Sequence, residues 1–361
     1  MEPYIIPLSD VRLADVPQVG GKNASLGELQ GALASEGINV PDGFAITAAA
    51  FREFLRVNEL EEHLANLMRW VQRPAYDNLH EMGSRARALI LDAVMPEALK
   101  VDITTAYRSL CQQEKMHVAV RSSATAEDLP DASFAGQHDS FLNIEGERNL
   151  LNAVQHCFAS LYNDRAIKYR EDKGFRHDQV AISVGVQKMV NASEGGAGVC
   201  FTLEPETGFR DIIHLSAVWG LGESIVQGIS SPDEYYVFKP TLEQGKKAII
   251  QRKIGAKEFT MQYAAGGRNI TSVPTALDRR QAFVLADAEV YQLSRWALAI
   301  ERHYGRPMDI EWARDGGTGK IFIVQARPET VHAAAHQPMR SFYTIREKGA
   351  CLVKERQSGK K

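Results

Sequence analysis

The sequence predicts an α+β fold, in which most helices precede most strands along the chain. Through most of residues 23–172, apolar residues recur at three- and four-residue intervals, which is the period of an amphipathic helix. From about residue 180, short apolar segments rich in β-branched residues alternate with glycine and proline turns. With 361 residues and 44% hydrophobic composition, the chain is long enough for one large domain or for two or three lobes with their own cores.

Helices are expected mainly in the first half. The first runs from Asn23 to Leu33, because Leu26, Leu29 and Leu33 recur at helical spacing, and Asn23 is suited to cap its N-terminus. The same spacing predicts helices over residues 48–71, 78–115 and 150–172, and a last one near residues 280–303.

Strands are expected mainly after residue 180. Four short segments are bounded by glycine or proline, namely AISVGVQKMV, GAGVCFTLEP, DIIHLSAVWG and DEYYVFKP. A hairpin follows at residues 308–326, where Asp-Gly-Gly-Thr-Gly supplies the turn. An earlier alternation of Val118 and Val120 predicts one more strand, which ends at Arg121.

Charge and hydropathy argue against two classes of partner. The net charge of −3 gives no basic excess for nucleic acid, and no apolar run reaches the length of a membrane span. The N-terminus lacks the charged start and continuous apolar core of a signal peptide. The four cysteines, Cys111, Cys157, Cys200 and Cys351, have no metal-ligand spacing and are expected to be reduced and buried. We therefore expect a cytoplasmic protein that binds neither nucleic acid nor membrane.

The segment GGKNASLGEL, residues 20–29, is a candidate anion site. Two glycines and Lys22 come directly before a predicted helix, where backbone N–H groups favour an anion and the ammonium adds a point charge. The segment is not a Walker A loop, because Val16 and Asn23 stand where that motif needs a glycine and a serine or threonine. A surface lysine at a capped helix start fits the same residues.

The predicted hairpin carries polar side chains that suit a metal-bound phosphate. Alternation places Asp309 and Glu311 on one face of its first strand. On the return strand, one face is expected to hold Ile321, Ile323, Gln325 and Arg327. Mg²⁺ prefers hard oxygen ligands, and an arginine suits a bidentate phosphate contact. A surface hairpin with solvated charges is the alternative.

Two further segments are suited to a nucleotide. The strand AISVGVQKMV ends with Gln187, Lys188 and Met189, which form an edge for a flat purine, although a methionine at a strand end is also typical of a core. After Arg121, about fifteen small, hydroxylated or acidic residues precede Gly136. This loop is too polar for a core and too distinctive in composition for a linker.

Several segments, taken in order, resemble a known family. They are VGGKNASLGEL, VPDGFAITAAAFREFL, AVRSSATAEDLPDASFAGQHDSFLN, FASLYNDRAIKYR, VWGLGESIVQG, SPDEYYVFKP and HYGRPMDIEWARDGGTGKIFIVQARPET. From about residue 5 to residue 330, the chain resembles the N-terminal nucleotide-binding part of the phosphoenolpyruvate synthase (pyruvate, water dikinase) family. Pyruvate phosphate dikinase and rifampicin phosphotransferase are wider relatives of that family.

The resemblance implies an ATP-grasp fold, in which two lobes, roughly residues 1–185 and 186–330, clamp ATP between antiparallel sheets. It implies that the phosphate-contacting, catalytic residues are Lys22, Arg121 and Arg327. The Mg²⁺ ligands that it implies, which also contact ATP, are Glu311 and Gln325. The other ATP contacts that it implies are Gly136, Ser140, Gln187 and Asp309. The polar loop after Arg121 would then close over the phosphates and exclude water.

The reaction of the family converts ATP, pyruvate and water into AMP, phosphoenolpyruvate and phosphate. By resemblance, ATP is cleaved in this part of the enzyme. A histidine on a swivelling domain then carries the phosphoryl group to pyruvate in a barrel domain. The resemblance therefore implies a phosphotransferase with ATP as substrate and Mg²⁺ as cofactor, in which positioning and charge stabilisation do most of the catalysis.

The chain departs from the family at its C-terminus. Residues 331–361 are expected to be a linker towards a phosphohistidine domain and a pyruvate-binding barrel, which this chain lacks and which another polypeptide could supply in trans. The HAAAH segment is not that histidine domain, because it lacks the preceding Gly-Gly-x-x-Ser/Thr and a core after it. His332 and His336 are therefore expected to be exposed linker residues. The remaining histidines are expected to lack a paired acid.

Three functions fit the sequence. The first is the ATP-binding and ATP-cleaving part of a phosphoenolpyruvate synthase, incomplete without its histidine and barrel domains. The second is the nucleotide domain of a rifampicin phosphotransferase-like enzyme, although the RSSATAEDLPDASFAGQ block favours the synthase. The third is a stand-alone, non-catalytic ATP-binding module. The polar residues of the candidate site argue against this third function, because a decaying site would lose costly polar clusters first.

Overall fold

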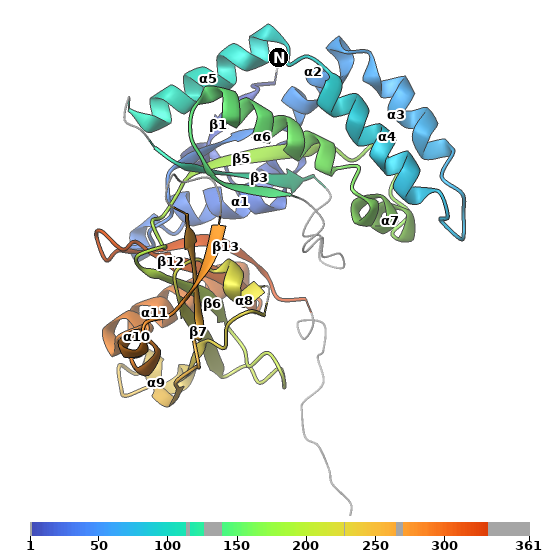
Figure 1. Ribbon diagram of the computed structural model, residues 1–361. Helices are drawn as coiled ribbons and strands as arrows, with labels where there is room; N and C mark the ends of the chain where they lie inside the picture. Colours follow the sequence, from blue (N-terminus) through green and yellow to red (C-terminus); the bar gives the residue numbers. More distant parts are fainter. Residues whose placement is uncertain (1, 113–115, 126–138, 227, 265–269, 331–361) are drawn as a thin grey trace, which may run out of the picture.

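The computed structural model describes residues 2–112, 116–125, 139–226, 228–264 and 270–330. Two antiparallel sheets dominate it: a five-stranded sheet from the first half of the chain and a six-stranded sheet from the second half (Figure 1). Helices cover both sheets, and a two-stranded sheet lies beside the second. This arrangement confirms the predicted α+β class.

The five-stranded sheet has the order β1-β2-β5-β3-β4. Its strands, in the order of the sequence, are β1 (Ile5–Pro7), β2 (Gly43–Ile46), β3 (Val118–Ala124), β4 (Ser140–Ile144) and β5 (Ile182–Lys188). The central strand β5 is fully buried along most of its length, because helices pack on both faces of the sheet. It ends at the link to the second sheet, so its last residues lie where the two sheets meet.

Six helices form a layer beside the five-stranded sheet. They are α2 (Ala48–Val57), α3 (Leu60–Arg69), α4 (Leu79–Asp92), α5 (Glu97–Cys111), α6 (Glu147–Ser160) and α7 (Asp164–Asp172). In this layer, α2, α5 and α6 contact the strands of the sheet, and α3, α4 and α7 pack on other helices of the layer. Their apolar faces form one core with the sheet, in which the rings of Phe51 and Phe54 lie 5.2 and 5.4 Å from that of Phe158. Burial of these aromatic rings contributes strongly to the stability of this half.

Three predicted helices are each divided into two in the structure. The expected helix over 48–71 breaks at Asn58 and at Glu59, which has a positive φ of 54°. The expected helix over 78–115 breaks before Pro96, which precedes the first residue of α5. The expected helix over 150–172 breaks at residues 161–163. Apolar periodicity continues across each break, because both pieces face the same core.

Helix α1 (Val16–Gly31) lies against the opposite face of this sheet and also contacts the second sheet (Figure 1). It kinks at Gly20, whose φ of 73° and ψ of 165° are not helical. A side chain at Gly20 would come within 2.4 Å of the Ser123 carbonyl oxygen, so the close approach of α1 to β3 requires glycine.

The predicted capping role of Asn23 is wrong. Asn23 lies inside α1, where it is buried rather than at a helix start. Its side-chain amide donates to the Val19 carbonyl oxygen (3.0 Å) and to the Ser183 hydroxyl of β5 (3.1 Å). The helix begins seven residues earlier than predicted because the residues before Gly20 form a turn of their own. Asn23 thus ties α1 to the sheet.

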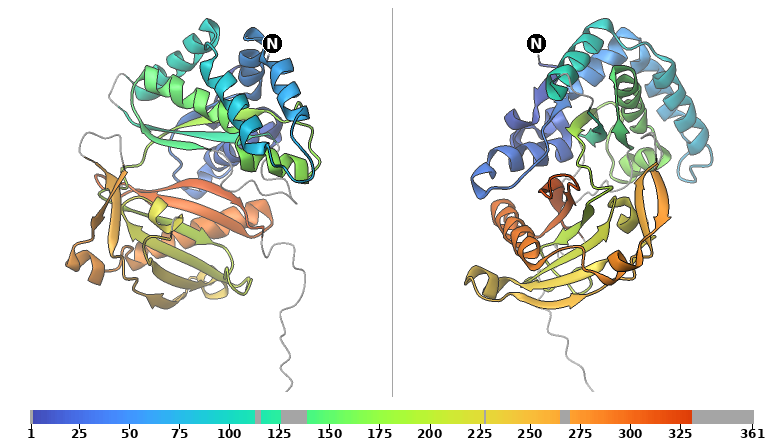
Figure 2. Two further views of the ribbon diagram at one scale, coloured as in Figure 1. Left: turned by 45° about the vertical axis from the view of Figure 1, so that its right-hand side comes forward. Right: turned by 60° about the vertical axis from the view of Figure 1, so that its left-hand side comes forward.

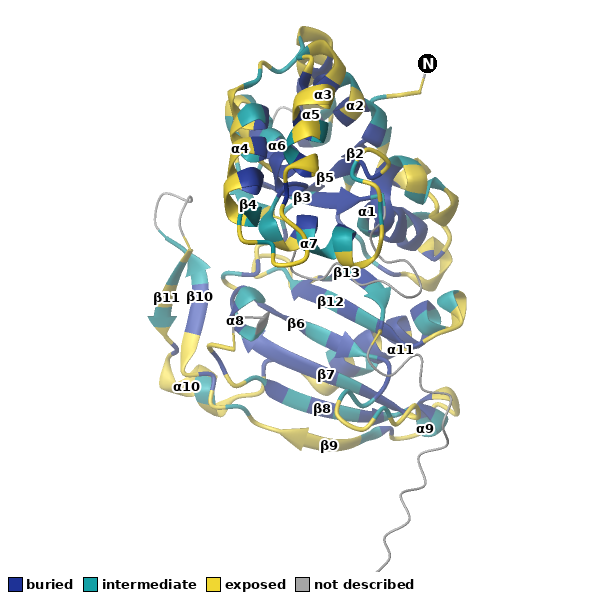
Figure 3. Ribbon diagram, turned by 90° about the vertical axis from the view of Figure 1, so that its right-hand side faces the viewer, coloured by how far each residue is buried: buried dark blue, intermediate teal, exposed yellow. Residues whose placement is uncertain are grey.

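The six-stranded sheet has the order β13-β12-β6-β7-β8-β9. Its strands are β6 (Gly196–Phe201), β7 (Ile212–Trp219), β8 (Asp233–Phe238), β9 (Ile249–Lys253), β12 (Met308–Arg314) and β13 (Ile321–Pro328). Helix α11 (Asp287–Tyr304) packs on one face and fills a second core around the fully buried Trp312. Figure 3 shows that burial is greatest in the central strands and that the edge strand β9 is exposed.

The hairpin β12–β13 differs from the predicted alternation. The strands pair with a bulge after Glu311, so Ile321 and Ile323 join Trp312 in the core, whereas Gln325 and Arg327 face the other way. The extra residue reverses the alternation of side chains along the strand. The expectation that Ile321 and Ile323 share a face with Gln325 and Arg327 is therefore wrong.

The remaining elements are short. They are the 3₁₀ helices η1 (Leu8–Asp10), η2 (Leu13–Asp15) and η3 (Ala34–Glu36), the helices α8 (Glu223–Val226), α9 (Lys239–Glu243) and α10 (Leu277–Gln281), and the hairpin of β10 (Phe259–Tyr263) and β11 (Ile270–Pro274). The hairpin lies beside the end of β7, because the Leu221 N–H donates to the Met261 carbonyl oxygen (2.9 Å). None of the helices in the described ranges combines the length and apolar character that crossing a bilayer requires.

Candidate functional site

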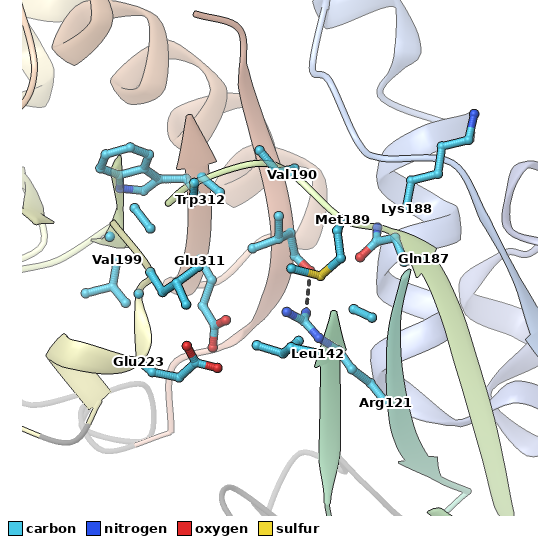
Figure 4. A pocket seen from close by; sticks show the side chains of 18 of the residues that line it. Arg121, Leu142, Gln187, Lys188, Met189, Val190, Val199, Glu223, Glu311 and Trp312 are labelled. Atoms are coloured by element: carbon cyan, nitrogen blue, oxygen red, sulfur yellow. Dashed lines mark hydrogen bonds between the residues drawn. The ribbon is translucent and has the colours of Figure 1, made fainter. Parts of the chain in front are cut away.

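A pocket of about 160 Å³ lies where the two sheets meet (Figure 4). Strands β3 and β5 line one side with Arg121 and Gln187, and β12 lines the other with Glu311. The link between the sheets, residues 188–192, crosses one edge of the pocket. The pocket is therefore built by residues that are far apart in the sequence and that both halves of the chain supply.

Arg121 joins the two halves at the pocket. Its guanidinium Nη1 donates to the Val324 carbonyl oxygen of β13 at 3.0 Å, and Figure 4 shows this contact. The prediction that the strand ends at Arg121 is wrong. Strand β3 continues to Ala124, because residues 122–124 also pair with β5. Ser140, at the start of β4, is exposed and lies directly opposite Arg121 in the sheet. Gly136 lies outside the described residues.

Lys22 lies in the first turn after the kink at Gly20. Its side chain is half-buried, and its Nζ lies 3.4 Å from the Ser122 carbonyl oxygen of β3. Because Ser122 follows Arg121 directly, the two cations approach the same part of β3. The kink therefore brings a lysine from α1 and an arginine from the sheet to one place, although Lys22 does not line the enclosed part of the pocket.

The hairpin β12–β13 supplies acids, an amide and a guanidinium. Asp309 is directly opposite Arg327, and Glu311 is directly opposite Gln325. Asp309 Oδ2 accepts hydrogen bonds from Arg327 Nε at 2.9 Å and from Nη2 at 2.7 Å. The predicted pairing of acids with an amide and a guanidinium is thus present, even though the alternation further along β13 is different.

The oxygen atoms of Glu311 and Gln325 fit a hard cation. Directly opposite residues in an antiparallel pair place their side chains about 5 Å apart. Neither side chain has a hydrogen bond or ion pair with the described part of the chain, so both oxygens are available. Mg²⁺ is commonly bound by one or two protein oxygens together with substrate phosphates. Among the described residues, no three His, Cys, Asp or Glu side chains form a metal site by themselves.

Gln187 and its neighbours form the wall next to the link. Gln187 is 4% exposed, and its side-chain amide donates to the Pro41 carbonyl oxygen at 3.1 Å. Lys188 pairs with Asp42 at 3.0 Å and so points away from the pocket centre. Met189 lies over the pocket in Figure 4. The outer edge of this wall is fixed by contacts with Pro41 and Asp42, in the loop before β2.

The structure thus brings Arg121, Gln187 and Glu311 together around one pocket. Three further predicted residues adjoin these three. Ser140 is opposite Arg121, Gln325 is opposite Glu311, and Lys22 contacts the residue after Arg121. Asp309 and Arg327 lie two positions further along the hairpin.

Sequence reasoning missed two pocket residues, Glu223 and Tyr263. Glu223 begins α8 directly after the turn Gly220–Gly222, and Tyr263 ends β10. Burial raises the pKa of both side chains, and the charge of Arg121 opposes this shift in each. The acid after Gly-Leu-Gly at the end of a strand was a usable signal, whereas nothing in the local sequence marks Tyr263.

The expectation that the histidines lack a paired acid is wrong. His80 contacts Asp164 at 2.8 Å, and His303 contacts Glu28 at 2.8 Å. A third pair joins His177 and Glu171 at 2.5 Å. None of these histidines lines the pocket. Two of the pairs were missed because the acid belongs to another helix, and the third joins His177, in the turn after α7, to Glu171 of that helix.

The cysteine prediction holds for the described residues. Cys111, Cys157 and Cys200 are buried and form no disulfide, and burial raises the pKa of each thiol. Cys351 lies outside the described residues, as do His332, His336 and the predicted linker.

Comparison with known proteins gives a consistent family. Residues 16–346 match the family described as "Pyruvate phosphate dikinase, AMP/ATP-binding domain". The chain is 47% identical to the phosphoenolpyruvate synthase of Pseudomonas aeruginosa over 365 aligned residues, which cover all of this chain and 46% of that protein. It is 44% identical to the enzyme of the same name from Escherichia coli, with 99% of this chain and 45% of that protein covered.

The phosphoenolpyruvate synthase of Neisseria meningitidis is 49% identical over 91% of this chain and 42% of its own length. The chain therefore spans less than half the length of the curated relatives that it matches. These relatives favour the synthase over the rifampicin phosphotransferase alternative. The family match, which extends over nearly the whole chain and includes every residue around the pocket, shows that this chain belongs to the pyruvate phosphate dikinase AMP/ATP-binding domain family.

Proposed function

We propose that this chain binds Mg²⁺-ATP between its two sheets and cleaves it as the nucleotide part of a phosphoenolpyruvate synthase. The observation that carries the proposal is the pocket between the sheets, which combines the predicted residues Arg121, Gln187 and Glu311. The arrangement proposed is an ATP-grasp clamp with lobes of roughly residues 1–185 and 186–330. Each lobe supplies one sheet to the clamp.

The cations bind the phosphates in this proposal. Lys22 of α1 and Arg121 of β3 approach from the first half of the chain, and Arg327 approaches from the hairpin, so the triphosphate is held from two sides. By resemblance, Gly136 and Ser140 also contact ATP; Ser140 is opposite Arg121 in the sheet, and Gly136 lies outside the described residues. Three cations fixed before the reaction stabilise the charge that develops on the transferred phosphoryl group, without reorganisation of the protein.

Glu311 and Gln325 would hold Mg²⁺ through their side-chain oxygens. When bound, the ion would neutralise phosphate charge and assist phosphoryl transfer. Asp309 holds the Arg327 guanidinium through two hydrogen bonds to one carboxylate oxygen, so it orients that arginine towards the phosphates. The base of ATP lies against the wall of Gln187 and Met189, next to the link between the sheets.

The complete reaction needs parts that the described structure does not include. In the proposed scheme, a phosphohistidine domain accepts the β- and γ-phosphates of ATP as one group, which leaves AMP. Water then releases the γ-phosphate, and the histidine delivers the remaining phosphoryl group to pyruvate in a barrel domain. Residues 331–361 would lead towards these domains, or a separate polypeptide would supply them. The greater length of the relatives supports this scheme. The products would be AMP, phosphate and phosphoenolpyruvate.

The proposal is tested by calorimetric titration of the full chain with ATP, with and without Mg²⁺. We expect saturable binding that tightens with the metal, and an affinity at least about tenfold weaker for Arg327→Ala, since a charged hydrogen-bonding partner is lost. Arg108→Ala, which removes an arginine from an exposed ion pair with Glu147, is the matched control. Unchanged affinity for Arg327→Ala, or no binding by the unaltered chain, would contradict the proposal.

The synthase reaction needs a second assay. The full chain is mixed with the remaining C-terminal part of the Pseudomonas aeruginosa relative, ATP, Mg²⁺ and pyruvate. Formation of AMP and phosphoenolpyruvate only when both polypeptides are present would support transfer in trans. ATP binding without any AMP under these conditions would favour the non-catalytic alternative.

A further inference from the structure

Two polar atoms in the pocket take part in none of the contacts proposed for the base, the phosphates or the metal. Glu223 Oε2 and the Tyr263 hydroxyl are both shielded from solvent, and neither has a hydrogen-bond partner in the described part of the chain. Leaving a buried polar group without a partner costs free energy, so such groups in a pocket usually meet a ligand. Both residues line the pocket between the sheets.

The position of Tyr263 is fixed on the side of the link. Its backbone N–H donates to the Ser193 hydroxyl at 3.3 Å, and Ser193 follows the link residues 188–192 directly. The ring contacts the small apolar cluster of Val190, Ala192 and Leu221. Tyr263 therefore stands next to the wall where the base of a nucleotide is proposed to lie.

Glu223 lies beside the proposed metal ligand Glu311 in the pocket. Its charge influences the hydroxyl of Tyr263 on one side, and the charge of Glu311 influences Glu223 on the other. Figure 4 shows the carboxylates of Glu223 and Glu311 beside each other, with the guanidinium of Arg121 across the pocket. Glu223 and Tyr263 thus add two polar groups, without a partner in the described chain, to the pocket that Gln187, Arg121 and Glu311 also line.

In a nucleoside triphosphate, the sugar joins the base to the phosphates. The ribose carries two neighbouring hydroxyl groups that can donate hydrogen bonds, and a carboxylate is an acceptor with room for both. A tyrosine hydroxyl can donate or accept. The two unsatisfied groups therefore match the hydrogen-bonding chemistry of the sugar, and they line the same pocket as the residues proposed to hold the base and the metal.

We propose that Glu223 and Tyr263 form the subsite for the ribose hydroxyls, through which the chain prefers ribonucleotides to deoxyribonucleotides. This inference rests on the proposed binding of ATP and assigns a residue pair to its sugar. A site that hydrogen-bonds a hydroxyl rejects the analogue that lacks it, because the polar groups of the protein are then left unpaired. A cation shared by Glu223 and Glu311 is the competing occupant. A comparison of ATP with its deoxy analogues distinguishes a ribose subsite from such a cation site.

The test compares the dissociation constants of ATP, 2′-deoxy-ATP and 3′-deoxy-ATP, measured by calorimetry on the full chain with Mg²⁺. The unaltered protein is expected to bind ATP about ten- to hundredfold more tightly than at least one deoxy analogue, as a hydrogen bond to a charged group is lost. In Glu223→Ala this ratio is expected to fall towards one, chiefly because ATP is bound less tightly. Tyr263→Phe, which keeps the ring, is expected to lower the ratio for at least one analogue.

Glu194→Ala is the matched control. Glu194 is an exposed acid near the same link and does not line the pocket, so its removal changes the net charge equally. This variant is expected to keep the preference of the unaltered protein. Circular dichroism melting curves check that each variant is folded.

Three results would overturn the inference. The first is equal binding of ATP and both deoxy analogues by the unaltered protein, which leaves the proposed ATP binding intact. The second is an equal loss of affinity for all three nucleotides in Glu223→Ala, which would assign Glu223 to a cation or to overall charge. The third is an absence of ATP binding, which would overturn the proposed function and this inference together.

Discussion

Two ion pairs on the six-stranded sheet use similar residues in opposite ways. Asp233 and Lys257 form a pair whose side chains are 0% and 1% exposed. The pair of Asp309 and Arg327 has side chains that are 13% and 28% exposed and lies on the face of the hairpin beside the pocket. The first pair is enclosed by protein, whereas the second is partly exposed and lies two strand positions from the pocket residue Glu311.

The enclosed pair is fully hydrogen-bonded. Asp233 Oδ1 accepts from the Gly255 N–H at 2.8 Å and from the Lys257 ammonium, and Oδ2 accepts from the Val284 N–H at 2.8 Å. The aspartate thereby connects β8 to two chain segments that have no regular structure. All its acceptor atoms are used within the protein, so this cluster stabilises the fold and has no capacity for a ligand.

The acids in and beside the pocket have carboxylate oxygens that are not used in hydrogen bonds with the described protein. Asp309 uses one carboxylate oxygen for both bonds to Arg327. The carboxylates of Glu311 and Glu223 lie beside each other, and burial and, to a smaller extent, the charge of Glu311 raise the pKa of Glu223. Like charges in a partly buried site are unfavourable, so the protein tolerates a cost that a bound ligand would relieve. The binding cluster therefore differs from the structural one by its hydrogen-bonding groups that have no partner among the described residues, and not by polarity itself.

The largest effect is expected at the enclosed pair. Lys257→Met leaves the Asp233 carboxylate buried without its counter-charge, and should lower the free energy of unfolding by about 3–5 kcal/mol. Urea denaturation of the full chain measures this loss. Lys253→Met is the control, because Lys253 is in an exposed pair with Glu234 and should change stability by less than about 1 kcal/mol. A loss of stability in Lys257→Met as small as that in Lys253→Met would show that the enclosed pair does not stabilise the fold more than an exposed pair does.

The second prediction concerns Glu311 in the pocket, where a substitution should weaken ligand binding without lowering stability. Glu311→Gln should leave the melting temperature unchanged or slightly raised, because it removes a repulsion with Glu223 and breaks no bond to the described protein. The same change should weaken Mg²⁺-ATP binding about ten- to hundredfold, since a charged oxygen ligand is lost. Calorimetry and thermal melting measure the two quantities on one sample.

Glu234→Gln serves as the control for Glu311→Gln. Glu234 lies on the same sheet but is paired with Lys253, so its replacement should leave nucleotide affinity unchanged. Strong destabilisation by Glu311→Gln would place Glu311 with the structural cluster instead of the pocket.

The sequence predicts the elements of this comparison better than their contacts. The α+β class and the strand segments follow from hydrophobic period, and Asp309, Glu311, Gln325 and Arg327 follow from alternation near the hairpin turn. The bulge after Glu311 does not, because a single extra residue leaves no mark in composition while it turns Ile321 and Ile323 into the core.

Contacts between distant segments were also out of reach of the sequence. Glu223 and Tyr263 are 40 positions apart and meet only because the β10–β11 hairpin lies beside the end of β7. Asn23 has the residue type of a cap, yet its tertiary contact with Ser183 decides its place inside α1. Local preference is overruled in such cases by packing, which a single sequence does not display.

A third ion pair, of Glu171 with Arg73, is partly buried, and its contribution to stability should depend on pH. Glu171 accepts hydrogen bonds at 2.5 Å from Arg73 and contacts His177 at 2.5 Å. The bonds from Arg73, and secondly the contact with His177, lower the pKa of Glu171 to about 2 although burial opposes the shift. A carboxyl whose pKa is lower in the folded state stabilises the protein above its unfolded pKa of about 4.3, and this stabilisation is lost as the pH falls towards 2.

Glu171→Gln should therefore reduce the free energy of unfolding at pH 7.5 by about 1 kcal/mol, a value that allows for solvent screening, and by less at pH 3. At pH 7.5 His177 is neutral in both states, because burial lowers its pKa further below neutrality, so the difference there reports on Glu171. Glu147→Gln, in the exposed pair with Arg108, is the control and should show a smaller change. Urea denaturation at the two pH values measures all three proteins. A difference between Glu171→Gln and the unaltered protein that is as large at pH 3 as at pH 7.5 would mean that this pair stabilises the chain by packing rather than by charge.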